Sequence, residues 1–272
     1  MSVDPVEFRE LCRSGKFQNQ TSGQCPGYAQ ANLVILPSAV AGDFRDLCIR
    51  NPVPLPLLGM SASPGDFSKI DDSRVLADNT FDIRKDFPSY NVYEKGTLVA
   101  SPSDISSLWN KQSVAFLIGC SFSFEHALAQ AGLPAKNSVL KKNVSMYKTS
   151  KMLDSAGIFV NVPYVVSMRP YKVKDVETVR AVTRKYRKTH GEPIDWGFEA
   201  LARLGIEDLR KPDYGDATEL AEDEIPVFWG CGVTAQVAAM SVASQIEGNI
   251  IGHAPGCMLV LDIQDEDIVS MI

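Results

Sequence analysis

A short pattern occurs twice in this chain, and its residue types are suited to binding an anion. At 114–125 and again at 225–236, an apolar run breaks at Gly-Cys and leads into a stretch rich in alanine. This pattern predicts a buried strand that turns into a helix. The first N–H groups of a helix lack partners inside it, and the helix dipole is positive there, so such a turn can hold a carboxylate or a developing oxyanion. Two such turns predict one site between them.

Small polar side chains follow both breaks. Ser121 and Ser123 follow the first Gly-Cys, and Thr234 and Gln236 follow the second. These side chains offer hydrogen-bond donors where a ligand would lie, and we expect them to bind substrate. The alternative is that both are ordinary strand-to-helix corners, in which glycine permits the turn and cysteine is a small buried hydrophobe.

The two cysteines of the pattern, Cys120 and Cys231, are also candidate nucleophiles. A helix N-terminus lowers the pKa of a thiol, which favours the reactive thiolate. A thiol route needs a base beside it, and His126 lies within the same predicted helix as Cys120 and so can face away from the turn. Covalent thiol chemistry is therefore the less favoured interpretation of these residues.

The polar loop at 18–28 is dense in amide and hydroxyl groups and leads into a predicted strand at 31–36. Amides are costly to bury unpaired and useful for holding a polar ligand, although a surface loop has the same composition. The residues that we expect to contact substrate here are Thr21, Ser22, Gln24, Tyr28 and Asn32.

Composition limits the classes of function. With 272 residues, 45% hydrophobic and 22% charged, the chain can bury a core as one large domain or two. A net charge of −6 and a pI near 5.2 argue against nucleic acid as a partner. Six cysteines without a C-x-x-C pair and three histidines argue against a zinc ribbon or a multi-histidine centre. No cofactor is predicted, and a carboxylate-rich Mg²⁺ or Mn²⁺ site stays open.

No targeting or membrane signal is recognisable in the sequence. The N-terminus has neither a basic leader nor an apolar core, and no apolar run approaches the ~20 residues that cross a bilayer. We therefore expect a cytoplasmic protein with no membrane partner.

The remaining pattern predicts a mixed α/β chain. We expect helices at 3–14, 39–48, 105–109 and 173–189, a hairpin within 81–99, a strand at 164–170 and an apolar terminal strand. After Gly132-Leu133-Pro134 the composition becomes basic and polar, which marks a boundary. We therefore predict a main α/β domain formed by 1–140 and 225–272, with a smaller α/β domain inserted at 141–224.

Eight stretches of the sequence resemble a known family. They are residues 20–23, 26–28, 30–37, 116–125, 166–170, 212–216, 227–229 and 253–256, and the resemblance extends over nearly the whole chain. The family is one of hydro-lyases that also supplies the N-terminal part of mammalian D-glutamate cyclase. The resemblance implies a three-layer α/β/α sandwich with a smaller two-layer α/β domain. It also implies interconversion of D-glutamate and 5-oxo-D-proline with loss or gain of water.

That reaction needs a cation for the α-carboxylate, donors for the oxyanion and an acid/base group. We expect Arg169 to bind the carboxylate through its bidentate fork; the alternative is a structural salt bridge. The oxyanion donors would be the backbone N–H groups after Cys120 and Cys231, aided by Ser121 and Ser123.

For acid/base chemistry the candidates are His253, held by Gly252 and the turn after it, and Asp216 in an acidic loop. Histidine titrates near neutral pH without tuning, although a hydrogen-bonded structural histidine is the alternative for His253. Glu125 can stabilise the first turn of its own helix.

Two other functions fit the same residues. One is a binding or regulatory protein for small acids without turnover, and the other is a hydratase or dehydratase of a different carboxylic acid. In each case the expected partner is a small-molecule carboxylate, and the sequence leaves a homo-oligomer open.

Overall fold

A ten-residue strand, β1 (Tyr28–Pro37), is central to the larger sheet in the computed structural model, which describes residues 4–77 and 80–271. It pairs antiparallel with β5 (Ser113–Gly119) on one side. On the other side it pairs with β10 (Asn249–His253) and β11 (Leu259–Gln264). The remaining strands of this sheet are β2 (Leu57–Met60), β3 (Tyr90–Glu94) and β4 (Thr97–Ala100), in the order β2-β5-β1-β10-β3-β4. The predicted strand at 31–36 and the predicted hairpin are confirmed.

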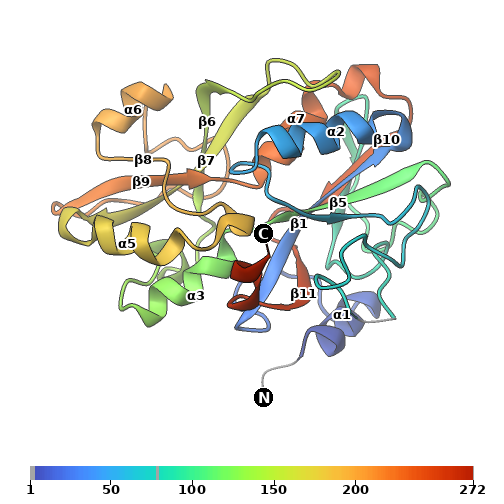
Figure 1. The fold of residues 1–272 in the computed structure, drawn as a ribbon, viewed down its shortest axis with the longest axis horizontal. Coiled ribbons are helices and arrows are strands. Elements are labelled where there is room, and N and C mark those ends of the chain that lie inside the picture. The colour runs from blue at the N-terminus through green and yellow to red at the C-terminus, as the bar shows by residue number, and fades with distance from the viewer. Residues whose placement is uncertain (1–3, 78–79, 272) are drawn as a thin grey trace.

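Both faces of the central strands β1 and β5 are buried, which explains why these strands read as continuous apolar runs. Leu33 and Ile35 of β1 pack into one core, and Val34 and Leu36 pack into another on the opposite face. The second core also contains residues of α2 (Ser38–Arg50) and α7 (Val233–Ser241), which lie together along the same side of the sheet (Figure 1).

The smaller sheet has four antiparallel strands in the order β6-β7-β9-β8. They are β6 (Ser145–Met152), β7 (Pro163–Lys172), β8 (Asp195–Trp196) and β9 (Glu224–Gly230). The helix α6 (Glu199–Leu204) packs on one face. The opposite face is covered by α3 (Phe122–Gln130) and α5 (Val176–Thr183), which Figure 1 shows on the other side of the strands from α6.

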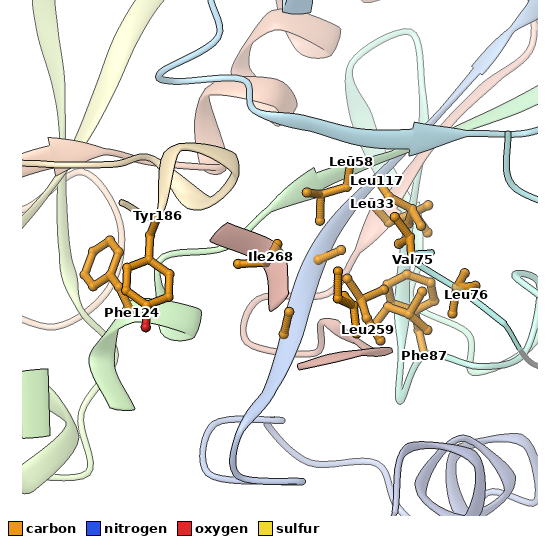
Figure 2. Packing of buried hydrophobic residues seen from close by; sticks show 14 of the residues in the cluster. Leu33, Leu58, Val75, Leu76, Phe87, Leu117, Phe124, Tyr186, Leu259 and Ile268 are labelled. Atoms are coloured by element: carbon orange, nitrogen blue, oxygen red, sulfur yellow. The ribbon is translucent and has the colours of Figure 1, made fainter. Parts of the chain in front are cut away.

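One hydrophobic core continues from the larger sheet to the smaller one. Figure 2 shows Ile268 between the residues packed near Val75 and Leu259 and the pair formed by Phe124 and Tyr186. The ring of Phe124 also lies 5.7 Å from that of Trp229 on β9, measured between centroids. The two sheets are therefore joined by shared apolar packing.

The helix predicted at 3–14 is confirmed as α1 (Pro5–Arg13), apart from position 3, which lies outside the described residues. The short α4 (Lys136–Val139) precedes the smaller sheet. The helix predicted at 105–109 is wrong, because Leu108 and Trp109 both donate to the carbonyl of Ile105 and form only a turn. The helix predicted at 173–189 is interrupted: α5 is flanked by the 3₁₀ segments Val173–Asp175 and Arg187–Thr189. No helix within the described residues is long and apolar enough to cross a membrane.

The architecture is thus mixed α/β with two antiparallel sheets. The three-layer arrangement and the inserted domain at 141–224 stay predictions. β9, which begins where that insertion was expected to end, pairs with β7 and β8 in the smaller sheet.

Candidate functional site

The two Gly-Cys turns come from different sheets and meet at one cavity. The first links β5 to α3, and the second links β9 to α7. Cys120 and Ser121 of the first turn and Cys231 and Gly232 of the second line a common cavity of about 200 Å³, called here the turn cavity. The repeated pattern predicted one site between the turns, and the structure brings them together.

Asn32, on β1, bridges the two turns and also lines the turn cavity. Its side-chain amide donates to the carbonyls of Ile118 and Gly119, both at 3.2 Å. On its other side it lies against Gly232, where an added Cβ would be 2.2 Å from Asn32 Nδ2. The second turn can therefore approach Asn32 only because residue 232 is glycine.

The helices that follow the turns begin without a side-chain cap, at Ser121 for α3 and at Gly232 for α7. The N–H groups of Phe122 and Val233 instead favour the thiolate forms of Cys120 and Cys231. Burial outweighs this effect, and it raises the pKa of Cys120 to about 12 and that of Cys231 to about 11. Both sulfurs are therefore thiols at neutral pH, which disfavours a nucleophilic role.

These raised pKa values predict slow alkylation of both cysteines. In the folded protein at pH 8, Cys120 and Cys231 should react with iodoacetamide at least ~100-fold more slowly than in the unfolded chain, because few thiolates are present. Peptide mass spectrometry after timed labelling measures both rates, with the urea-unfolded protein as control. Rapid labelling of either cysteine in the folded protein would restore the nucleophile hypothesis.

His253, at the end of β10, also lines the turn cavity. Its Nδ1 lies 3.2 Å from the Leu33 N–H and 3.5 Å from the Leu33 carbonyl, and the shorter contact favours the neutral tautomer that accepts at Nδ1 and carries its proton on Nε2. Burial lowers the pKa of His253 to about 4. At neutral pH the ring is therefore uncharged, with Nε2–H as the donor left for a ligand.

Arg169 lines neither this cavity nor the one described next. Its side chain is fully buried and pairs with Glu125, with Nη2 2.5 Å from Oε1. The guanidinium also donates to Ser121 Oγ at 2.9 Å and to Ser167 Oγ at 3.0 Å. This geometry supports the alternative role, a structural salt bridge, through which Arg169 positions Ser121 of the first turn.

A second cavity of about 490 Å³ adjoins the first and shares the lining residues Phe122 and Asn143 with it. It is called here the lysine cavity, because Lys141 and Lys142 line it together with Asp265. Of the residues expected to contact substrate, Ser22, Gln24 and Tyr28 lie in this cavity.

The other predicted residues have structural partners. Thr21 is buried: its hydroxyl lies 2.8 Å from Gln30 Oε1, and its N–H donates to the carbonyl of Gly256. Thr234 is buried against β7, where its hydroxyl accepts from the N–H of Val165 at 3.2 Å. Neither residue lines one of the two cavities, and both stabilise the backbone around them.

Ser123 is buried in the first turn of α3, and its hydroxyl has no hydrogen-bond partner among the described residues. Asp216 is exposed and lines neither cavity. Its carboxylate accepts from the N–H of Asn143 at 2.8 Å, so it positions a wall that the two cavities share. Substrate binding by Ser123 and a catalytic role for Asp216 stay predictions.

Sequence reasoning missed several cavity residues. Gln236, which belongs to the repeated pattern and was expected beside a ligand, is not one of them, and it lines the turn cavity. Lys141, Lys142 and Asn143 lie in the basic stretch that marked a domain boundary. Asp265 follows an apolar strand with nothing in its neighbours to indicate a cavity. Within residues 4–77 and 80–271, no cluster of three or more His, Cys, Asp or Glu side chains could hold a metal ion.

Comparisons with known proteins find similar sequences over most of the chain. Residues 114–262 match the family model described as D-glutamate cyclase. A "Putative hydro-lyase" of Verminephrobacter eiseniae is 42% identical over 266 residues, covering 98% of this chain and 93% of that protein. A "Putative hydro-lyase" of Rubrobacter xylanophilus is 44% identical, covering 96% of each chain. One from Bordetella pertussis is 47% identical, covering 92% of this chain and 86% of its own.

Proposed function

This chain belongs to the D-glutamate cyclase family, and on that premise we propose that it adds water to, or removes water from, a small carboxylic acid, with D-glutamate and 5-oxo-D-proline as the substrate pair. The observation that carries the proposal is the convergence of two uncapped helix starts on one cavity beside a neutral histidine. Such an arrangement suits a reaction in which negative charge develops on one oxygen.

Cyclisation of D-glutamate passes through a tetrahedral carbon that carries an oxyanion. The free amine attacks the γ-carboxyl carbon, and one oxygen of that carboxyl group leaves as water. In the reverse direction water adds to the lactam carbonyl and the ring opens. Donors at the starts of α3 and α7 would stabilise the oxyanion, and Asn32 holds the two turns at a fixed separation.

His253 suits the role of a neutral hydrogen-bond donor in this reaction. Because Nδ1 accepts from the backbone of β1, Nε2–H is the group that a ligand in the turn cavity can engage. A pKa of about 4 keeps the ring from taking a second proton at neutral pH, so it can polarise a carbonyl oxygen without carrying charge.

The α-carboxylate of the substrate would bind in the lysine cavity, toward Lys141 and Lys142. Arg169 is unsuited to that role because Glu125 and two serine hydroxyls already engage its guanidinium. The lysines are exposed, so they offer attraction without the desolvation cost of a buried charge.

Chiral mass spectrometry tests the proposed reaction directly. The purified protein would be incubated with D-glutamate, L-glutamate and each enantiomer of 5-oxoproline, with and without Mg²⁺ or Mn²⁺. Conversion confined to the D series supports the proposal. Binding without conversion favours the role of a small-acid binding protein, and neither binding nor conversion by the folded protein redirects the search to another carboxylic acid.

The variant His253→Ala should lower kcat by about 10²- to 10³-fold, because a preorganised donor to the oxyanion is lost. The affinity for substrate should change little, since this contact strengthens mainly in the transition state. The variant His253→Gln, which keeps an N–H donor, should recover part of the activity. Steady-state kinetics and calorimetric binding measure the two effects, and undiminished turnover in His253→Ala would exclude this role.

A further inference from the structure

Asp265 is a buried carboxyl group in the wall of the lysine cavity, directly after β11. Its side chain is buried at 4% exposure, and its Oδ1 has no hydrogen-bond partner among the described residues. The Asp265 N–H donates to the carbonyl of Gly27, which ties the residue to the polar loop that also lines this cavity. An unpaired oxygen on a buried carboxyl group is costly, and because Asp265 lines the cavity, a ligand there can complete the interactions of this group.

The groups around Asp265 do not supply a cation in contact with it. The hydroxyl of Ser123 lies near enough to favour its ionised form but does not reach hydrogen-bond geometry. The other titratable or charged groups nearby are Glu266 and Tyr186, together with the cavity residues Glu125, His126, Lys141 and Lys142. Glu125 is engaged by Arg169, so Asp265 is the acidic group of this cavity that lacks a basic partner among the described residues.

We propose that Asp265 binds the ammonium group of the substrate and accepts a proton from it, while the reacting carboxyl group lies in the adjoining turn cavity. This inference rests on the proposed function. It places the positive end of the substrate against Asp265 and its α-carboxylate toward Lys141 and Lys142 across the same cavity. The shared walls at Phe122 and Asn143 put the two cavities within reach of one small molecule.

The proton transfers balance with Asp265 in this role. One N–H bond of the ammonium breaks as an O–H bond forms on the Asp265 carboxylate, and the freed electron pair of the amine attacks the γ-carboxyl carbon. The leaving oxygen then takes one proton back from Asp265 and a second from the new C–N nitrogen, and departs as water. Asp265 ends ionised, as it began.

Burial suits Asp265 to this task. It raises the pKa of the carboxyl group from 3.8 to about 7, which makes the carboxylate a stronger base than an exposed aspartate. Because the acceptor form is the ionised one, turnover of D-glutamate should rise as the pH is raised through about 7.

The test compares Asp265→Asn with Asp265→Glu and with the exposed control Asp267→Asn. Asp265→Asn should lower kcat for D-glutamate by about 10²-fold or more and abolish the rise in rate near pH 7. Its affinity for D-glutamate should fall at least ~10-fold, while its affinity for glutarate, which lacks the amine, should stay the same. Asp265→Glu should restore part of the pH-dependent rate, and Asp267→Asn should match the wild type.

The outcomes separate this inference from the proposed function. If the wild type is active and Asp265→Asn turns over D-glutamate at the same rate, the role of Asp265 is overturned and the proposed reaction stands. Binding of D-glutamate that depends on Asp265, without turnover in the wild type, would support the ammonium site and overturn the reaction. Equal losses of D-glutamate and glutarate affinity would show that Asp265 only maintains the cavity, and no binding of either by the wild type would overturn both proposals.

Discussion

Glu125→Gln will lower the free energy of unfolding by about 3 to 5 kcal/mol. The reason is that Arg169 is fully buried and Glu125 is its only acidic partner among the described salt bridges. Glutamine keeps the size of the side chain but leaves the guanidinium charge uncompensated beside the rings of Phe124 and Trp229. Urea unfolding followed by circular dichroism measures the loss.

Two further variants show whether the charge is the cause. Glu177→Gln removes an acidic partner from a pair in which Glu177 is 76% exposed, and it should cost less than about 1 kcal/mol. The double variant Glu125→Gln with Arg169→Met leaves no buried charge, and it should be more stable than Glu125→Gln alone. Similar small losses in Glu125→Gln and Glu177→Gln would contradict the interpretation of the buried pair.

Gly232→Ala will disrupt the turn cavity and reduce turnover by about 10²-fold or more, because a small misplacement of reacting groups has effects of this size. A methyl group there would lie 2.2 Å from Asn32 Nδ2, so either the amide leaves the carbonyls of Ile118 and Gly119 or the second turn moves away. Overpacking of this kind also costs about 1 to 3 kcal/mol of stability.

The matched control for this variant is Gly42→Ala. Gly42 lies within α2, and an added Cβ there meets no atom within 4 Å. It should therefore leave turnover unchanged and raise stability by about 0.5 to 1 kcal/mol, since alanine is the better helix former. In an Asn32→Ala background, Gly232→Ala should lose most of its cost to stability. If Gly232→Ala is as destabilising in the Asn32→Ala background as in the wild type, Asn32 is not the side chain with which the added methyl group clashes.

The strand-to-helix turns and their convergence could be predicted from the sequence, because the pattern that carries them is local and occurs twice. The hydrogen-bond and ion-pair partners of individual side chains could not be predicted. Arg169 has the residue type of a carboxylate anchor, but its role depends on Glu125, which lies on a helix of a distant segment. Asp265 is recognisable only when β11 and the polar loop are folded against each other, since burial of a carboxyl group is a property of tertiary packing.

The larger sheet depends on β1, which belongs to the N-terminal part of the chain. The span 114–262 that matches the family model begins after β1, yet it contains β10 and most of β5 and β11, and each of these strands pairs with β1 along one edge. Without β1, these strands would expose unpaired edges and both apolar faces, and Asn32 would be missing from between the turns. We therefore expect the matched span not to fold by itself, and excising it to yield an aggregating fragment instead of a minimal enzyme.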